Sequence, residues 1–357
     1  MITRQSFRYI PFFILLFFPK VAYSSWDEIC EIPNNAQPVA HWNFNKDGFS
    51  SLTNGIVTWH DFHGGVKAIP DTDLQGVRFH YDGKGPEGDA TSELRYKITR
   101  PMAHVWEHLK IWQPKNFYHR QIVKIKSSQI LEPEIWKPGD KVTSENGNGA
   151  RVAKASEDVL YVIRPDSIYS QTWGEGKTIT NTSNNASFTS KESKYLPGNN
   201  KLSAMWQGKY SNAAMIVGTR PLPINRNGKE GNGYCDAQTS KSGAHGPTAM
   251  KQNQLEVGEN PVCFDVRNNG SVVEVVIERK RASVFKPANG VYKIWTRTQV
   301  EDWQLIYSNE AVVAYQAENN YFDSGYVFGW SNSGFAEDTN FYLLEWGLWD
   351  TKPSFLP

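Results

Sequence analysis

The stretch that decides the fold of this chain is Ser92-Glu-Leu-Arg-Tyr-Lys-Ile98, in which charged and apolar residues alternate strictly. One face of the predicted strand carries the charges (Glu93, Arg95, Lys97), and the opposite face carries apolar side chains (Leu94, Tyr96, Ile98). A solvated face tolerates any polar mixture, whereas an acid and two bases in line are suited to gripping an anionic, hydroxyl-rich chain. The stretch predicts a strand whose charged face is either simply solvated or a binding surface.

Short apolar patterns of period two continue along the chain, separated by Gly, Pro, Asn and Asp turns, without a long amphipathic helix. They predict an all-β fold: an antiparallel β-sandwich of jelly-roll type with long loops and under about a tenth of its residues in helix. The last strand is expected to return beside the first. Two polar stretches, Ser170–Asn200 and Asn225–Asn260, are predicted to be long loops over one end or face of the sandwich.

The start of the chain has the pattern of an export signal. Arg4 and Arg8 precede an apolar run, and Ala22 and Ser24 are small residues at the two positions that a signal peptidase reads. Residues 1–24 are therefore expected to be a signal peptide and the mature protein to be secreted or periplasmic.

The remaining residues, 25–357, are expected to form a single β-jelly-roll domain, since all-β domains reach this size when their loops are long. No other run reaches the roughly 18 to 20 apolar residues of a membrane span, so no membrane association is expected after signal cleavage. A monomer is expected.

Composition excludes some partners and favours others. The formal net charge of +1 and the lack of a dense basic block argue against nucleic acid, so an anion must be bound by a local patch. The chain has 13 Trp and 16 Tyr, whose flat faces can pack against sugar rings or fill a large β core.

Three cysteines remain after removal of the predicted signal. In an oxidising compartment two of them should pair, and Cys235 with Cys263 closes the shortest loop. That disulfide is the expected one, which leaves Cys30 free or competing for one of the other two.

Other predicted strands place Lys or Arg beside aromatic or amide side chains. These positions are Tyr118, Arg120, Gln121, Lys201, Trp206, Tyr292, Lys293 and Trp295. Spread over one curved sheet they would line a groove for an acidic polysaccharide. Alternation alone does not fix which face each side chain takes, because a one-residue slip in register reverses it.

Several motifs carry a family resemblance, namely Ser92-Glu-Leu-Arg95, Asn116-Phe-Tyr-His-Arg120, Asn199-Asn-Lys-Leu-Ser-Ala-Met-Trp206, Asn289-Gly-Val-Tyr-Lys-Ile-Trp295 and the stretch Gly325–Thr339. The sequence resembles secreted proteins of the concanavalin A-like lectin/glucanase superfamily. Within it, the chain is similar to the jelly-roll polysaccharide lyases of the heparin lyase I, glucuronan lyase and alginate lyase kind.

The resemblance implies β-elimination from a uronate-containing polysaccharide, in which a cation or amide neutralises the carboxylate while a base and an acid move protons. The candidate catalytic residues are Arg95 as neutraliser, Gln121 or Lys201 assisting, and His119 or Tyr292 as base, with Tyr118 an alternative base. The candidate substrate-binding residues are Glu93, Tyr118, Arg120, Lys201, Trp206, Lys293 and Trp295. They are expected to converge on the concave sheet.

Two other activities and one metal are left open by the sequence. A carbohydrate-binding, lectin-like protein without catalysis could use the same basic and aromatic face. A glycoside hydrolase would need two carboxylates in a cleft, and Glu274 and Glu278 look like solvent-side positions. No cofactor is required, although loop carboxylates could hold a structural Ca²⁺: Asp47, Asp71, Asp73, Glu337 and Asp338.

Overall fold

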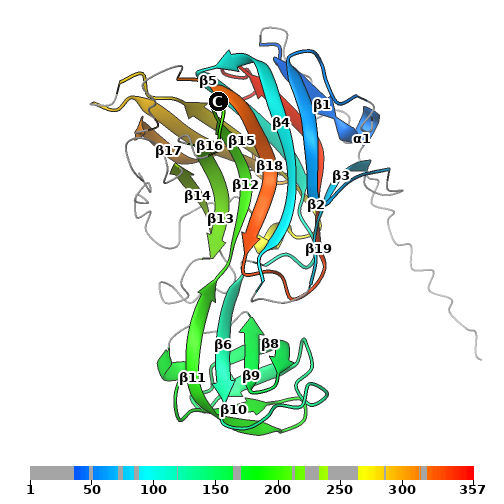
Figure 1. Ribbon diagram of the computed structural model, residues 1–357, viewed down its shortest axis with the longest axis vertical. Coiled ribbons are helices and arrows are strands. Elements are labelled where there is room, and N and C mark those ends of the chain that lie inside the picture. The colour runs from blue at the N-terminus through cyan, green and yellow to red at the C-terminus, as the bar shows by residue number, and fades with distance from the viewer. Residues whose placement is uncertain are drawn as a thin grey trace, which may run out of the picture.

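Two antiparallel sheets face each other, and a small closed barrel lies beyond one end of them (Figure 1). The computed structural model describes residues 36–47, 51–70, 75–83, 88–118, 120–163, 170–210, 214–221, 233–239, 264–284, 287–312, 314 and 320–357. Every strand pairing among these residues is antiparallel.

The first sheet, sheet B, has the strand order β14-β13-β12-β18-β4-β2. Its strands are β14 (Gly233–Thr239), β13 (Met215–Pro221), β12 (Asn199–Trp206), β18 (Phe322–Asn332), β4 (Ala90–Met102) and β2 (Val57–Pro70). The strand predicted from the opening stretch of sequence is the central part of β4, which lies between β2 and β18.

The second sheet, sheet A, has the order β2-β3-β19-β5-β15-β16-β17, and β1 also pairs with β19. Its further strands are β3 (Gln75–Tyr81), β19 (Thr339–Trp349), β5 (His104–Trp112), β15 (Val272–Lys280), β16 (Gly290–Thr298), β17 (Gln304–Val312) and β1 (Ala40–Asn43). The last strand therefore lies beside the first, as the sequence predicted.

Strand β2 belongs to both sheets, and two glycines allow it to turn from one to the other. Residues up to Gly64 pair with β4, and residues from Gly65 pair with β3. Gly64 has φ +67°, and a Cβ there would lie 1.9 Å from the carbonyl oxygen of Thr91. A side chain at this bend would collide with the backbone, so the Gly-Gly pair in the sequence is required by the sandwich.

A buried carboxylate joins the two sheets inside the sandwich. Glu107 of β5 accepts hydrogen bonds from Tyr96 Oη of β4 at 2.8 Å and from Trp346 Nε1 of β19 at 2.9 Å. It also accepts from Ser203 Oγ of β12 and from Arg279 NH1 of β15, the latter at 2.7 Å. The side chains of Glu107 and Arg279 are both 0% exposed, and these four donors supply the partners that a buried charge requires.

Six strands form the closed barrel, in the order β10-β11-β6-β9-β8-β7. They are β6 (Gln121–Ser127), β7 (Lys141–Ser144), β8 (Gly149–Ser156), β9 (Val159–Ile163), β10 (Thr178–Asn181) and β11 (Ser187–Pro197). The barrel encloses an apolar cluster of its own, which includes Val123, Leu160 and Phe188. The expectation of one jelly-roll domain did not include this second β unit.

One arginine fixes the barrel to the sandwich at the point where the chain passes between them. Arg120, which directly precedes β6, donates to the carbonyl oxygens of Ser333, Asn199 and Asn332 at 2.6, 2.7 and 2.8 Å. It also donates to Asn200 Oδ1 at 2.7 Å. Burial lowers the pKa of Arg120 to about 10, so it keeps its charge at neutral pH.

The fold predicted from sequence is confirmed, with 60% of the described residues in strands and 3% in helix. The described helical segments are α1 (Phe44–Asp47), α2 (Ser170–Trp173) and the 3-10 turn η3 (Val266–Asn268). The prediction of a loop over Ser170–Asn200 is wrong, because α2, β10, β11 and the start of β12 lie there. In the second predicted loop, residues 233–239 form β14, and most of the rest lies outside the described residues.

The predicted signal peptide, Cys30 and Cys263 also lie outside the described residues, so the Cys235–Cys263 disulfide stays a prediction. Within the described part of the chain, no helix has both the length and the hydropathy needed to cross a membrane.

Replacing Arg120 tests how far the junction depends on one side chain. Arg120→Ala removes four hydrogen bonds and leaves their acceptors without this donor at a buried site, so the free energy of unfolding should fall by about 3 to 5 kcal/mol. Urea denaturation followed by tryptophan fluorescence measures it. Arg100→Ala is the matched control, because Arg100 pairs with Asp350 at an exposed site and should cost under about 1 kcal/mol. Equal losses in the two variants would contradict the assignment.

Candidate functional site

The outer face of sheet B carries the charged side chains of β4. Leu94 and Tyr96 point into the sandwich core, so Glu93 and Arg95 lie on the opposite, outer face. Arg95 Nε donates to Glu93 Oε1 at 2.5 Å, with side-chain exposures of 39% for Arg95 and 3% for Glu93. The buried carboxylate therefore holds a guanidinium that reaches solvent.

An irregular segment of β18 opens space beside Glu93. Phe328, which pairs with Glu93, has φ +58° and packs its ring in the core against Phe79 at 4.5 Å. The next residue, Gly329, has φ +144°, and a Cβ there would lie 3.2 Å from Glu93 Oε2 and 3.6 Å from Lys201 Cβ. Backbone strain of this kind is often found at functional sites. Because Gly329 has no side chain, Glu93, Lys201 and the ring of Tyr326 all approach the same point beside its backbone.

Aromatic rings border the cations on the same face. Tyr326 of β18 pairs with Arg95, and its ring stacks on that of Tyr210 at 5.8 Å. The two hydroxyls are 3.2 Å apart, and Lys201 Nζ lies 5.7 Å from the centre of the Tyr210 ring. Trp206 contacts both tyrosines, with ring centres 5.3 and 5.7 Å away.

On the other side of β4, strand β2 contributes two histidines and an aspartate. His60 pairs with Arg95, and His63 pairs with Glu93. Asp61 lies between them in a bulge with φ +46°, and its Oδ2 is 3.1 Å from His60 Nδ1 and 3.8 Å from His63 Nε2. A carboxylate on one ring nitrogen orients an imidazole and leaves the other nitrogen available for proton transfer.

His60, Arg95 and Tyr326 thus form one row across three neighbouring strands. Sequence analysis assigned no role to His60, His63 or Tyr326. The signal was available in His60-Asp-Phe-His63, in which an acid stands between two histidines of a strand, and in the Gly325–Thr339 stretch that carried part of the resemblance.

Burial shifts the pKa values of three polar groups on this face. It lowers the pKa of the Lys201 ammonium, although the nearby charges of Glu93 and Asp89 raise it. Burial also raises the pKa of Tyr210, which its hydrogen bond to Tyr326 lowers in part, and it raises the pKa of Tyr326 well above the ordinary value. Both phenols therefore stay protonated at neutral pH and can donate a proton.

No known protein family matches this chain, and neither does any curated protein. Solved structures do. The chain is similar to the exoplasmic/lumenal domain of VIP36 in its Ca²⁺/Man3GlcNAc-bound form, at 11% identity and TM-score 0.35, over 82% of this chain and 84% of that chain.

It is also similar to the marine PL-14 alginate lyase from Aplysia kurodai, at 9% identity and TM-score 0.38, over 88% of this chain and 99% of that chain. The potassium-bound carbohydrate recognition domain of Emp46p matches at 8% identity and TM-score 0.32, over 87% and 96%. With TM-scores this low, what this chain binds has to be inferred from its own side chains.

Of the residues predicted from sequence, Glu93, Arg95, Lys201 and Trp206 share the outer face of sheet B, and others do not reach it. Tyr292 faces the sandwich core at 0% exposure, where burial raises its pKa far above the ordinary value. Tyr118 belongs to the same apolar cluster, Arg120 is the buried junction residue, and Gln121 is buried at the start of β6.

The predicted convergence of Tyr292 with Arg95 is therefore wrong, and His119 lies outside the described residues.

Lys293 and Trp295 lie on the far side of the molecule, on the outer face of sheet A. Lys293 pairs with Glu310 at 2.6 Å, and Trp295 belongs to an apolar cluster with Trp106, Trp349 and Leu356. These two residues cannot line the same groove as Arg95.

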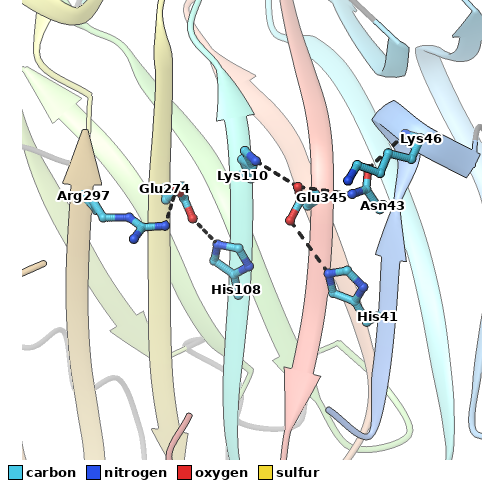
Figure 2. A network of polar contacts seen from close by, with 8 residues as sticks. All are labelled: His41, Asn43, Lys46, His108, Lys110, Glu274, Arg297 and Glu345. Carbon is cyan, nitrogen blue, oxygen red and sulfur yellow. Dashed lines mark hydrogen bonds and ion pairs between the residues drawn. The ribbon is translucent and has the colours of Figure 1, made fainter. Parts of the chain in front are cut away.

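The outer face of sheet A is occupied by an ion-pair ladder that crosses five strands (Figure 2). The register places its members in one row: Arg297, Glu274, Lys110, Glu345 and Asn43. Three ion pairs join members of this row to each other or to His108: Arg297 with Glu274 at 2.7 Å, His108 with Glu274 at 2.9 Å, and Lys110 with Glu345 at 2.8 Å. The carboxylates of Glu274 and Glu345 already have cationic partners. We therefore assign this row of charges a role in stability.

Of the predicted calcium ligands, Glu337 and Asp338 have described side chains, and both accept hydrogen bonds from the protein. Asp338 Oδ1 accepts a hydrogen bond from Gly83 N at 2.9 Å, and Glu337 Oε2 accepts one from Asn116 Nδ2 at 3.5 Å. In the described part of the chain, no three His, Cys, Asp or Glu side chains gather to hold a metal ion. Asp71 and Asp73 lie outside the described residues, so calcium stays a prediction.

The ladder predicts acid sensitivity at Glu345. Burial would raise the pKa of this carboxyl, but the nearby His41 ring and the charge and hydrogen bond of Lys110 lower it to about 2. The folded-state pKa is depressed, so the stabilisation is present above the ordinary carboxyl value and is lost as pH falls from about 4.5 to about 2. On the order of 3 kcal/mol of unfolding free energy should disappear over this range.

Denaturant titrations of Glu345→Gln and wild type across this pH range measure the difference. The variant should have the lower unfolding free energy at neutral pH, and the difference from wild type should disappear in acid. Glu310→Gln, which removes an exposed partner of Lys293, is the control and should track wild type. A difference in unfolding free energy that is the same at every pH would contradict a stabilising role for the ionised Glu345.

Proposed function

We propose that the outer face of sheet B binds an acidic, uronate-containing polysaccharide and cleaves it by β-elimination in a secreted or periplasmic setting. The observation that carries the proposal is the row His60, Arg95 and Tyr326, which puts a cation between an imidazole and the hydrogen-bonded phenols of Tyr326 and Tyr210. Lys201 and the rings of Tyr210 and Trp206 extend this row along the face.

Arg95 is suited to the uronate carboxylate. Its guanidinium is planar and held by Glu93, so it can be oriented before substrate arrives, while its exposed side can accept an anion. Neutralising the carboxylate makes the neighbouring C–H proton removable, because the negative charge that develops in the transition state is stabilised.

Two neighbours can move the protons. His60, oriented by Asp61 through Nδ1, takes the proton from the carbon next to the carboxylate. A C=C bond forms, the bond to the bridging oxygen breaks, and the hydroxyl of Tyr210 protonates the leaving oxygen. Tyr326, 3.2 Å from that hydroxyl, completes the donor pair.

Replacing Arg95 tests the assignment. Arg95→Ala should lower kcat on the cleaved polymer by about 100- to 1000-fold, the range found for loss of one transition-state charge donor. Ultraviolet absorbance of the unsaturated uronate product, with alginate, glucuronan, heparin and pectate as substrates, gives the rate. His60→Ala should lower kcat by at least about 100-fold.

Lys97→Ala is the matched control, since Lys97 is an exposed cation two residues further along β4 on the same face. If turnover depends on the one positioned charge of Arg95 and not on the total charge of the face, the kcat of Lys97→Ala should stay within about threefold of wild type. Unchanged turnover in Arg95→Ala would reassign the neutraliser.

Retention of a uronate polymer without any absorbance change would instead favour a carbohydrate-binding protein that lacks catalysis. New reducing ends without absorbance would indicate hydrolysis.

A further inference from the structure

The barrel carries a lysine-rich stripe on its outer surface. Val123, Leu160 and Val162 fill the barrel interior, so Lys124 and Tyr161, which alternate with them, face outward. The register pairs Lys194 of β11 with Lys124 of β6, and Lys124 with Tyr161 of β9.

Tyr161 in turn pairs with Lys154 of β8, so one row of side chains crosses four strands. Lys126 adds a fourth cation, since it lies two residues beyond Lys124 on β6 and also faces outward. The residue opposite Lys126 in the strand register is an acid, Glu192. Since neighbouring strands are about 4.8 Å apart, the row spreads its cations over a length that suits an extended chain, not a single small anion.

Three of these four cations, Lys126, Lys154 and Lys194, are available to a ligand. Lys154 and Lys194 are exposed, and Lys126 is half-buried. Within the part of the chain that the structure describes, none of these three forms an ion pair with a carboxylate. By contrast, Lys177 elsewhere on the barrel is paired with Glu145 at 2.7 Å.

Strand β8, which carries Lys154 of the stripe, also carries a residue that lines a pocket at the junction with the sandwich. Arg151, which precedes Lys154 on β8, lines a pocket between the two units together with Asn116, Tyr118 and Glu337. The pocket offers a guanidinium, an amide and a carboxylate, groups that bind the hydroxyls and carboxylates of sugars. Arg151 thus lies at the junction on the same strand as Lys154 of the stripe.

We infer that this lysine stripe, Lys124, Lys126, Lys154 and Lys194, is a second binding surface for a polyuronate chain, separate from the outer face of sheet B. The inference rests on the proposed function for the identity of the polymer. A surface that holds the polymer away from the reacting sugar raises the local concentration of substrate, as two linked binding sites do.

The side chains favour a glycan over a single-stranded nucleic acid. Nucleic-acid channels combine cations with aromatic faces on which bases stack. Tyr161, the ring within this stripe, is only 4% exposed, and Lys124 Nζ lies 5.8 Å from its centre. The stripe thus offers charge and hydrogen-bond donors but no free stacking face, which suits a hydroxyl- and carboxylate-rich chain.

The test measures binding of the full chain to immobilised alginate in low and high salt. Lys154→Glu/Lys194→Glu should raise the Kd about tenfold in low salt, and the difference should vanish at high salt because exposed charges are screened. Lys137→Glu/Lys352→Glu is the matched control, with the same charge change at exposed lysines outside the stripe, and should stay within about twofold of wild type. Equal melting temperatures exclude misfolding as the cause.

A second measurement separates this inference from the proposed function. On uronate oligosaccharides that occupy sheet B alone, the stripe variant should keep the wild-type kcat and KM, and only its KM for long polymer should rise. If no substrate is cleaved but the charge reversal still weakens alginate binding, the stripe stands and the lyase proposal falls. Unchanged alginate binding in the stripe variant, or equal competition by single-stranded DNA, would overturn the inference.

Discussion

The structure depends on one buried negative charge, that of Glu107. An ionised carboxylate inside a sandwich is stable only if donors surround it, and here they come from both sheets. Tyr96 is the neighbour of Arg95 on β4, and Ser203 is two residues from Lys201 on β12. The interior network thus fixes the two strands whose outer residues form the candidate site, so the spacing of its cations is set from inside the protein.

The sequence predicts this fold well because each sheet has one face in the core, so that alternation shows directly which residues share a side. Glu93 and Arg95 were placed together for that reason, and Lys201 and Trp206 meet them on β12. Alternation does not state which side is outward. Tyr292 alternates as regularly as Arg95 does, but its side is the core side, where Arg279 is its neighbour. Arg120 was missed as a junction residue because three of its four acceptors are backbone carbonyls, which no sequence pattern marks.

The barrel was not predicted because two of the strands that close it, β10 and β11, bury few apolar residues. Strand β10 buries the apolar Ile179, and β11 buries Phe188, among polar residues most of which are exposed. A polar stretch with isolated apolar residues looks like a loop when strands of five or more alternating residues are sought. Only closure of the six strands makes those isolated residues into a core.

The position of the barrel in the chain has a consequence for folding. Its six strands pair only among themselves, within one continuous segment that begins at Gln121 and ends at Pro197, where these two residues face each other. The sandwich instead pairs β1 with β19 and β4 with β18, which join the two ends of the chain. Local contacts form fast and distant ones slowly, so on the ribosome the barrel can be complete before the sandwich has its last strands. The row that contains Arg95 then comes into being only when β18 arrives, which makes the candidate site one of the last parts of the molecule to assemble.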